Sequence, residues 1–463
     1  MKTISLKRMA SGATSSPSRI LLLSFMAMIL LGALGLMLPA SSLKGSLSFT
    51  DALFTATSAG CVTGLSVFDV AATLSPYGQG LLLLLIQLGG LGIMTLSTLF
   101  ILGAKGRVGF AETLIIQDTF THSGSRRPSE ILGDVIRATA VLEAVGALLL
   151  FIRFLVAGMP TPKALWMAVF HSVSAFCNAG FSLFSGSLTP FRGDWVVMAV
   201  VSALIVAGGL GFLVISEING FKHGNPFQKA RWHRLSLHTR LVLTTTLVLL
   251  VIGTGLTLLL EWENTLGGLP FHEKILAAFF QSVTLRTAGF NTLDIGSLAN
   301  GTLFLSMIFM FIGASPGSCG GGVKTTTIAT LFLMGRSRLK GEAHVFAFSR
   351  TIPARSVEKA TNLMMMAFTL VALGTLVLLS SELGDLAHTQ SRGHFIELLF
   401  ESVSAFGTVG LSMGITGSLS TLGKWVIIML MFVGRLGPMV IALAVSRETT
   451  SSYRWAEEDI MIG

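Results

Sequence analysis

Eight long apolar stretches constrain this chain more than any other feature of its sequence. Five are almost free of charge and cover residues 20–38, 80–102, 195–216, 241–260 and 362–380; three weaker ones cover 139–157, 302–334 and 425–445. A helix needs about 20 apolar residues to cross a hydrocarbon core of ~30 Å. A soluble core could not absorb eight such helices, so the pattern predicts an all-α membrane protein with eight transmembrane helices.

Charged residues are scarce and unevenly placed along the chain. They make up 12% of the 463 residues, against about 25% in soluble domains. Of the 32 Lys and Arg residues, 22 lie at the N-terminus and in segments 104–140, 219–240, 335–360 and 447–463, which alternate with the other loops. This positive-inside asymmetry predicts a multi-pass protein of the cell membrane with both termini in the cytoplasm. Topology therefore explains the net charge of +9, and we expect no nucleic-acid partner.

Four short segments between alternate pairs of apolar stretches resemble one another. They read FTATSAGCVTGLS (54–66), FHSVSAFCNAGFS (170–182), FFQSVTLRTAGFN (279–291) and FESVSAFGTVGLS (400–412). Aligned without gaps, each has a Phe ten residues before a Gly, in the pairs Phe54–Gly64, Phe170–Gly180, Phe279–Gly289 and Phe400–Gly410. Ordinary extracellular loops are the alternative, but they do not need an apolar, helix-like run only about half a membrane long.

The repetition predicts four helix–pore loop–helix repeats around a pseudo-fourfold pore. We expect the repeats at 20–104, 139–218, 241–335 and 361–446. Cytoplasmic segments are expected at 1–19, 105–138, 219–240, 336–360 and 447–463.

The residues around each repeated Gly suit a dehydrated alkali cation, which needs rings of backbone carbonyls. Extended backbone of this kind uses conformations open mainly to Gly. The half-helix before each Gly points its negative dipole end, worth about half a charge, toward the axis. The predicted carbonyl donors for a potassium ion are Val62, Thr63, Gly64, Asn178, Ala179, Gly180, Thr287, Ala288, Gly289, Thr408, Val409 and Gly410.

These segments resemble the Trk/Ktr/HKT superfamily of potassium transporters. The most specific pieces are TSAGCVTGLSVFD, SAFCNAGFSLF, SVTLRTAGFNTLD and SAFGTVGLS, and the likeness covers nearly the whole chain from residue 20. The resemblance implies that the four filter glycines select potassium. Some plant relatives have Ser at the first position and pass sodium, whereas this chain has Gly64.

Within the superfamily, the chain is similar to the shorter Ktr-type membrane subunit, KtrB. Trk-type subunits carry two extra helices before the first repeat, whereas only the stretch 20–38 precedes the first filter here. The resemblance implies a potassium uptake pore, a homodimer in the membrane and a cytosolic ring of KtrA-like nucleotide-binding subunits. ATP or ADP is expected only on that partner, and no cofactor is expected on this chain. Sodium dependence is left open.

Each repeat also carries a glycine-rich patch after its filter Gly. The patches are Gly89–Gly92, Gly208–Gly211, Gly313–Gly322 and Gly434–Gly437. For the first two we expect close helix packing through small residues.

The third patch, GASPGSCGGG, places a Pro and five glycines inside a stretch too long for one crossing. Gly and Pro break helices, and broken helices at the midplane line cavities. We therefore expect a gate below the filter, with a structural kink as the alternative. Its predicted residues are Gly313, Ala314, Ser315, Pro316, Gly317, Ser318, Gly320, Gly321 and Gly322. The run to Lys324-Thr325 also resembles a phosphate-binding loop, but it has one residue too many before the Lys and no preceding strand.

Arg435 lies near the centre of the last apolar stretch. An Arg at that depth costs about 2.5–3.5 kcal/mol, so it should face a cavity or a partner. One interpretation is an ion pair with Glu143 or Glu401. The other, favoured because relatives carry Arg here, is a positive charge near the pore that raises the barrier for cations or holds the loop at 313–322 shut. Arg286, three residues before Gly289, is expected to brace the filter from behind.

Two other transport classes compete with a gated pore. A Trk-like ion-coupled carrier would need intramembrane carboxylates, and Glu143 is the clear mid-span candidate. The potassium-binding subunit of a P-type pump shares the filter plan but is longer, with extra helices. The sequence has no Walker motif, zinc spacing or catalytic triad, so we expect no enzyme activity.

Overall fold

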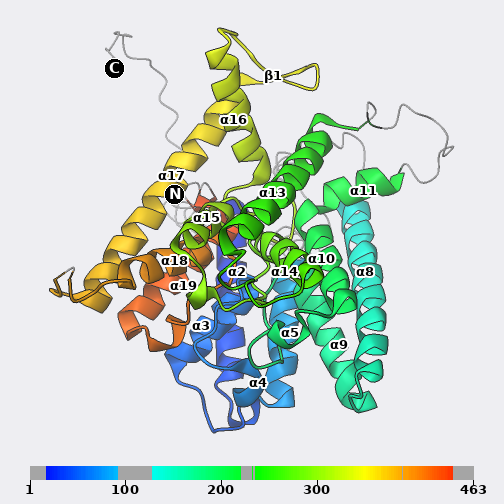
Figure 1. Cartoon of the computed structure of the whole chain (residues 1–463), viewed down its shortest axis with the longest axis vertical. Coiled ribbons are helices and arrows are strands. Elements are labelled where there is room, and N and C mark those ends of the chain that lie inside the picture. The colour runs from blue at the N-terminus through cyan, green and yellow to red at the C-terminus, as the bar shows by residue number, and fades with distance from the viewer. Residues whose placement is uncertain are drawn as a thin grey trace, which may run out of the picture.

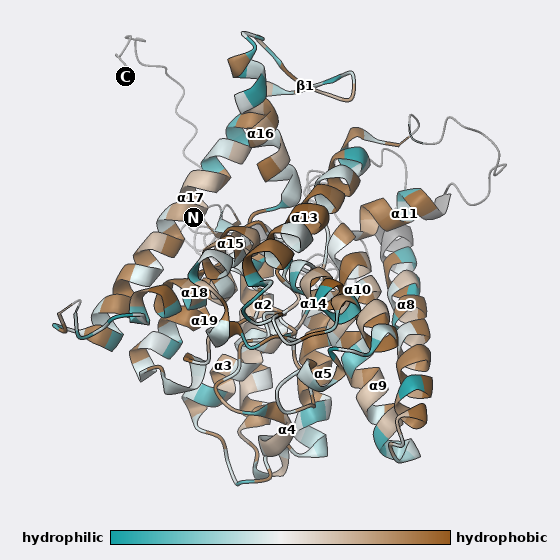
Figure 2. Cartoon of the chain, viewed as in Figure 1, coloured by the Kyte–Doolittle hydropathy of each residue, from teal (hydrophilic) through white to brown (hydrophobic). Residues whose placement is uncertain are grey.

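The computed structural model describes residues 17–91, 128–220, 232, 235–387, 389–438 and 440–441. Most of the predicted N-terminal segment, most of the linker 105–138 and the whole tail 447–463 lie outside these residues. The described part is a helix-rich bundle (Figure 1). Hydrophobic residues cover the outer faces of its long helices, as a membrane protein requires (Figure 2).

Each of the eight predicted apolar stretches overlaps a helix. They are α2 (Pro17–Leu36), α5 (Pro76–Gly90), α8 (Pro128–Val156), α10 (Trp195–Leu210), α13 (Leu237–Glu261), α15 (Asn300–Phe311), α17 (Ala354–Leu383) and α19 (Thr421–Leu436). Among the described residues, three helices are long and apolar enough to cross a membrane alone, within α8, α13 and α17. The bent pair formed by α10 and α11 (Phe212–Gly220) provides a fourth crossing if it counts as one span.

Four shorter helices carry the first part of the repeated segments. They are α3 (Phe49–Gly60), α9 (Thr161–Phe176), α14 (Phe271–Thr284) and α18 (His394–Gly407). The Ser48 side chain caps α3 by accepting from Asp51 N at 3.1 Å, and a Pro immediately precedes both α9 and α14. The C-terminal halves of these helices are buried among the longer helices. We call the four the pore helices.

The second long helix of every repeat ends at its glycine patch. α5 ends at Gly90, and α10 ends at Leu210, where Gly211 takes a φ of +92° and the chain bends by 100° into α11. α15 ends at Phe311 and α16 (Thr325–Leu339) follows the third patch, while α19 ends at Leu436. The second patch was expected to serve close helix packing; Gly211 in addition breaks the helix there.

Close packing through glycine is nevertheless present in three of the patches. A methyl group added to Gly89 would overlap Gly60 O, one added to Gly208 would overlap Phe176 O, and one added to Gly434 would overlap Phe406 O. In each case the contact is with a carbonyl at the end of the pore helix of the same repeat. These glycines therefore set how closely each long helix approaches the filter.

The fold is not purely helical. A hairpin of β1 (Val345–Ala347) and β2 (Arg350–Ile352) lies inside the predicted linker 336–360. Phe348 and Ser349 form its turn with φ of 48° and 62°. The hairpin and the adjoining end of α16 lie at the end of the molecule opposite α4 (Val70–Thr73) (Figure 1).

Candidate ion pathway and gate

The backbone has the same shape at all four repeated glycines. The residue two positions before each Gly has a left-handed φ: 57° at Val62, 58° at Asn178, 64° at Thr287 and 50° at Thr408. The glycines themselves have φ of 97°, 69°, 77° and 92° in chain order. Positive φ is uncommon outside Gly. Its recurrence at four equivalent positions shows that the likeness of the four segments extends to their conformation.

The four glycines meet in a closed cycle. A methyl group on Gly64 would lie 2.6 Å from Ala179 O, and one on Gly180 would lie 2.8 Å from Ala288 O. One on Gly289 would lie 2.5 Å from Val409 O, and one on Gly410 would overlap Thr63 O. Each repeat thus faces the carbonyl of the next, and the fourth faces the first. The structure therefore brings the predicted filter residues together, with no room for a side chain at any of the four glycines.

Amide groups in the filter segments are bonded to the pore helices. Thr63 N donates to Ser58 O and Ala179 N to Ser174 O, both at 2.8 Å, and Val409 N donates to Ser404 O at 2.9 Å. Within the described residues, no protein donor bonds the carbonyls of Thr63, Ala179, Ala288 or Val409. Carbonyls with unused lone pairs are the ligands that alkali cations require.

The third repeat differs from the others by one residue. Phe280 is 0% exposed, as are Phe54, Phe170 and Phe400, whereas Phe279 is 37% exposed. Thr284 then takes the place of the pore-helix serines, and Ala288 N donates to Thr284 O at 3.0 Å, four residues back rather than five. The gap-free alignment on Phe279 was therefore wrong for this pore helix. Its connection to the filter is one residue shorter than in the other repeats.

Arg286 lies within this shortened connection. Its side chain is buried, and Nη2 donates to Thr246 Oγ1 of α13 at 3.3 Å. The arginine thus links the end of the third pore helix to the first long helix of its own repeat, as expected for a brace.

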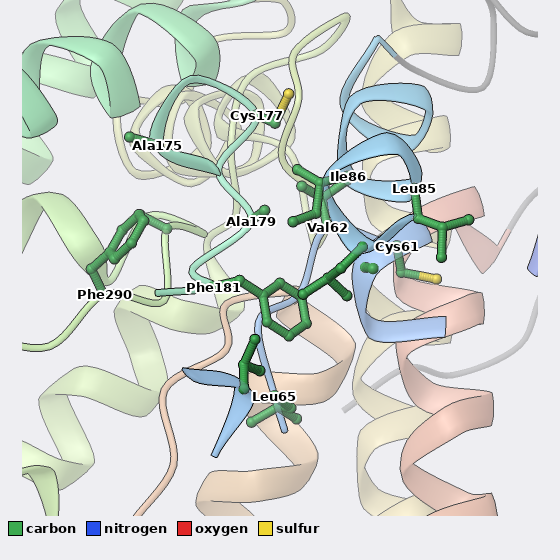
Figure 3. Close-up of a cluster of buried hydrophobic side chains, with 14 of the residues drawn as sticks. Cys61, Val62, Leu65, Leu85, Ile86, Ala175, Cys177, Ala179, Phe181 and Phe290 are labelled. Atoms are coloured by element: carbon green, nitrogen blue, oxygen red, sulfur yellow. The ribbon is translucent and has the colours of Figure 1, made fainter. Parts of the chain in front are cut away.

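Apolar side chains surround the first two filter segments. Val62, Leu65, Ala179 and Phe181 belong to one buried hydrophobic cluster (Figure 3). The described residues contain no group of three or more His, Cys, Asp or Glu side chains able to hold a metal ion.

The third glycine patch lies directly against the filter segments. Gly321 N donates to Thr408 Oγ1 at 2.9 Å, and a methyl group on Gly320 would overlap Thr287 Oγ1. No helix is present between Phe311 and Thr325, so the predicted helix break is confirmed. We call residues 313–322 the glycine loop.

Backbone hydrogen bonds tie the glycine loop to the second long helices of two other repeats. Ser315 N and Cys319 N each donate at 3.1 Å, to Gly209 O and Gly208 O in repeat 2, and Gly322 N donates to Gly434 O in repeat 4 at 3.3 Å. The loop therefore extends across the bundle beside the filter rather than along its own repeat.

Arg435 bonds the glycine loop. Its Nη1 donates to Cys319 O and its Nη2 to Gly89 O of repeat 1. The two carboxylates considered as its partners are bonded elsewhere: Glu143 accepts from Gln87 Nε2 at 3.3 Å and Glu401 from Thr416 Oγ1 at 2.5 Å. The ion-pair interpretation was wrong, and the predicted contact with the loop is present.

Lys324 also bonds this loop, a contact that the sequence did not predict. Its Nζ donates to Gly320 O at 2.7 Å and lies 3.5 Å from Gly321 O. Its one sequence signal is its place at the end of the glycine run, where the spacing resembles that of a phosphate-binding loop. The lysine of that rejected motif contacts the chain's own carbonyls.

The sequence profile of the TrkH family, described as "Cation transport protein", matches residues 7–455. The chain belongs to this family. It is 37% identical to the Ktr system potassium uptake protein B of Bacillus subtilis over 457 residues, 97% of each chain. It is 36% identical to the protein of the same name from Vibrio alginolyticus, over 97% of this chain and 96% of that one.

Two further comparisons agree with that assignment. The potassium/sodium uptake protein NtpJ of Enterococcus hirae is 36% identical, with 97% of each chain covered. The crystal structure of the potassium transporter TrkH from Vibrio parahaemolyticus matches 93% of this chain and 85% of its own with a TM-score of 0.72; at 21% identity this shows a shared fold. The resemblance to the Trk and Ktr proteins is confirmed. Because the family and these relatives are transporters, the expectation that the chain is not an enzyme fits them.

Proposed function

We propose that this chain is the ion-translocating subunit of a Ktr-like potassium uptake system in the cell membrane. Four repeats, each with two crossings and one pore helix, surround a single pseudo-fourfold pore, and both termini are cytoplasmic. The names of the relatives, potassium uptake protein B and potassium/sodium uptake protein, support potassium as the transported ion. The alternation of basic segments along the sequence supports the orientation.

The closed cycle of filter glycines is the observation that carries this proposal. Four carbonyl-bearing segments with one backbone conformation meet where no side chain fits. The four pore helices end beside them, so four negative dipole ends favour a cation there without a formal negative charge. A uniform set of glycines leaves only carbonyl oxygen as ligand, which suits a dehydrated potassium ion.

The glycine loop is the gate of this pore. It contacts the filter through Thr287 and Thr408 and is tied to repeats 1, 2 and 4 by Arg435 and backbone hydrogen bonds. A segment rich in glycine can refold there without leaving backbone groups unsatisfied, provided it lines a protein cavity. Release of these contacts opens the path below the filter.

The pore works as part of a larger assembly. The Ktr system names of the relatives imply further subunits, and we assign a homodimer in the membrane and a KtrA-like cytosolic ring that carries ATP or ADP. The basic residues Arg336, Arg338, Lys340 and Arg350, near the hairpin, provide a cytoplasmic face for such a ring. Light scattering on the purified protein in mild detergent tests the dimer, and a stable monomer would contradict it.

Rubidium uptake into liposomes tests the function directly. The purified chain alone should admit rubidium down its gradient, with sodium concentration and membrane potential varied independently. Uptake that follows the rubidium gradient and potential supports a pore. Liposomes that take up no more rubidium than protein-free liposomes under any condition would contradict the proposal.

An ion-coupled carrier is the second candidate, and one observation favours it. The Glu143 carboxylate of α8 lies 3.7 Å from Cys177 Sγ, and Cys177 immediately precedes the filter residue Asn178. A titratable group inside a membrane and next to an ion path is a coupling site by default. If coupling exists, rubidium uptake will depend on a proton or sodium gradient at fixed potential. The same liposome experiment separates the two candidates.

A further inference from the structure

Two side-chain cations bond three successive carbonyls of the glycine loop. Arg435 donates to Cys319 O, while Lys324 donates to Gly320 O at 2.7 Å and lies 3.5 Å from Gly321 O. Both cations come from the chain itself, one from α19 and one from the residue before α16. Carbonyl oxygens that would otherwise be open to a cation are therefore already bonded to one.

The position of Lys324 has no explanation in helix capping. It is the N-cap residue of α16, and its side chain makes no capping hydrogen bond. Ser, Thr, Asp and Asn are preferred there because they accept from the first amides, and a positive charge is disfavoured at the positive end of the helix dipole. Exceptions to such local rules are expected at functional sites. The carbonyls of Gly320 and Gly321 supply the compensating contacts.

These carbonyls belong to the part of the loop that touches the filter. Gly321 N donates to Thr408 Oγ1, and Gly320 packs on Thr287 Oγ1. An ammonium group with carbonyl ligands at this place carries the same charge as a dehydrated alkali ion with carbonyl ligands. The two oxygens belong to residues that contact Thr287 and Thr408, each two positions before a filter glycine.

We propose that Lys324 is a tethered cation that occupies an ion site of the closed pore and competes with the transported ion for Gly320 O and Gly321 O. The inference rests on the proposed function, because it names a positioning residue within the same gate. Opening then requires the ammonium group to leave these oxygens, and cations in the pore favour its departure. A lysine that only stabilises the loop would show no such competition.

The first test separates charge from hydrogen bonding in rubidium uptake by liposomes. Lys324→Met removes both, Lys324→Gln keeps donors without the charge, and Lys324→Arg keeps both. Competition predicts that Met and Gln lower the half-saturating rubidium concentration by roughly tenfold, the scale of one charge-assisted hydrogen bond. The Lys324→Arg variant should have a half-saturating rubidium concentration close to that of the parent. Lys163→Met, at the exposed start of α9, is the control lysine and should not change it.

The second test does not depend on transport. With Cys61 and Cys177 replaced by Ala, Cys319 is the only thiol in the chain, and its rate of reaction with a thiol reagent reports on the loop. Lys324→Met should raise that rate, and rubidium should restore the slower rate because the ion takes the place of the ammonium group. Choline is too large for a site formed by backbone carbonyls, so it should not restore the slower rate of labelling.

Each outcome of these tests supports or overturns the inference. An unchanged half-saturating concentration in both uncharged variants, or labelling of Cys319 that rubidium does not slow, overturns it. If Lys324→Met fails to assemble, the Gln variant decides the question alone. If the parent protein takes up no rubidium, the proposed function fails, while the labelling result still reports whether a cation replaces Lys324.

Discussion

The third and fourth repeats have the same filter conformation but very different second helices. Thr287 and Thr408 share a left-handed backbone with φ of 64° and 50°. In repeat 4, α19 continues to Leu436, with Gly434 packed against Phe406 O. In repeat 3, α15 ends at Phe311 and the chain is not helical again until Thr325.

The difference shows how one chain can keep four segments of similar backbone conformation and still make the second helix of one repeat unlike the others. Glycine serves opposite purposes in the two repeats. In repeat 4 it permits a contact too close for any side chain, which fixes the helix. In repeat 3 it permits backbone that a helix does not allow, so the loop can fold beneath the filter. Separate repeats of one polypeptide can diverge in this way, whereas four identical subunits could not.

The largest expected effect on stability tests which of two adjacent phenylalanines the third pore helix buries. Phe280→Ala removes a fully buried ring and should lower stability by about 3–5 kcal/mol. Phe279→Ala, on the partly exposed neighbour, should have a much smaller effect. Thermal unfolding of the two purified variants in detergent compares them. If the two variants lose the same stability, or if Phe279→Ala loses more, the gap-free alignment on Phe279 is correct.

The close packing of Gly434 in repeat 4 gives the next largest expected effect on stability. Gly434→Ala places a methyl group onto Phe406 O and should destabilise the protein by about 1–3 kcal/mol through overpacking. Gly335→Ala in α16 is the control, because no heavy atom lies within 4 Å of the added methyl group. It should be neutral or slightly stabilising, since Ala exceeds Gly in helix propensity. The comparison fails if both variants unfold at the same temperature.

The glycine loop gives an effect on transport rather than on stability. Shortening it by deletion of residues 320–322 should raise basal rubidium uptake by about tenfold, the equivalent of ~1.4 kcal/mol, without changing the rubidium-to-sodium ratio. Arg435→Ala should also raise uptake, because it removes the bonds to Cys319 O and Gly89 O. The two changes should not add, since both release one element.

Additive effects would count against this account of the gate. So would a deletion that leaves uptake unchanged in a protein that still assembles. The loop would then be a structural kink, and the difference between repeats 3 and 4 would concern packing alone.

The sequence was sufficient to predict a helix-rich membrane protein with four short helices before the repeated glycines, because repetition and apolar length are physical constraints that act locally. Four similar segments between long apolar stretches predict pore helices, and each is present. A charge at the depth of Arg435 predicts a polar partner, and the resemblance to the family favoured the loop over a carboxylate as that partner. These inferences needed no knowledge of how distant elements pack.

Other features depend on packing between distant elements and could not be predicted. The adjacent residues Phe279 and Phe280 satisfy the same pattern, and only burial shows which of them points inward. The bend at Gly211 follows from a φ that the sequence GGLG permits but does not require. Lys324 attracted attention only through a motif for another chemistry, because its partners are backbone oxygens that carry no sequence signal.

The selectivity of the Gly64→Ser variant tests the central claim most directly. A methyl group at Gly64 already lies 2.6 Å from Ala179 O, so a serine side chain must displace a carbonyl from the cycle formed by the four filter segments. The measurement is the ratio of rubidium to sodium uptake in liposomes, for this variant and for the parent. The account predicts that the variant admits sodium and that its ratio falls. A ratio equal to that of the parent, in a variant that assembles and transports, would contradict the assignment of Gly64 to the filter.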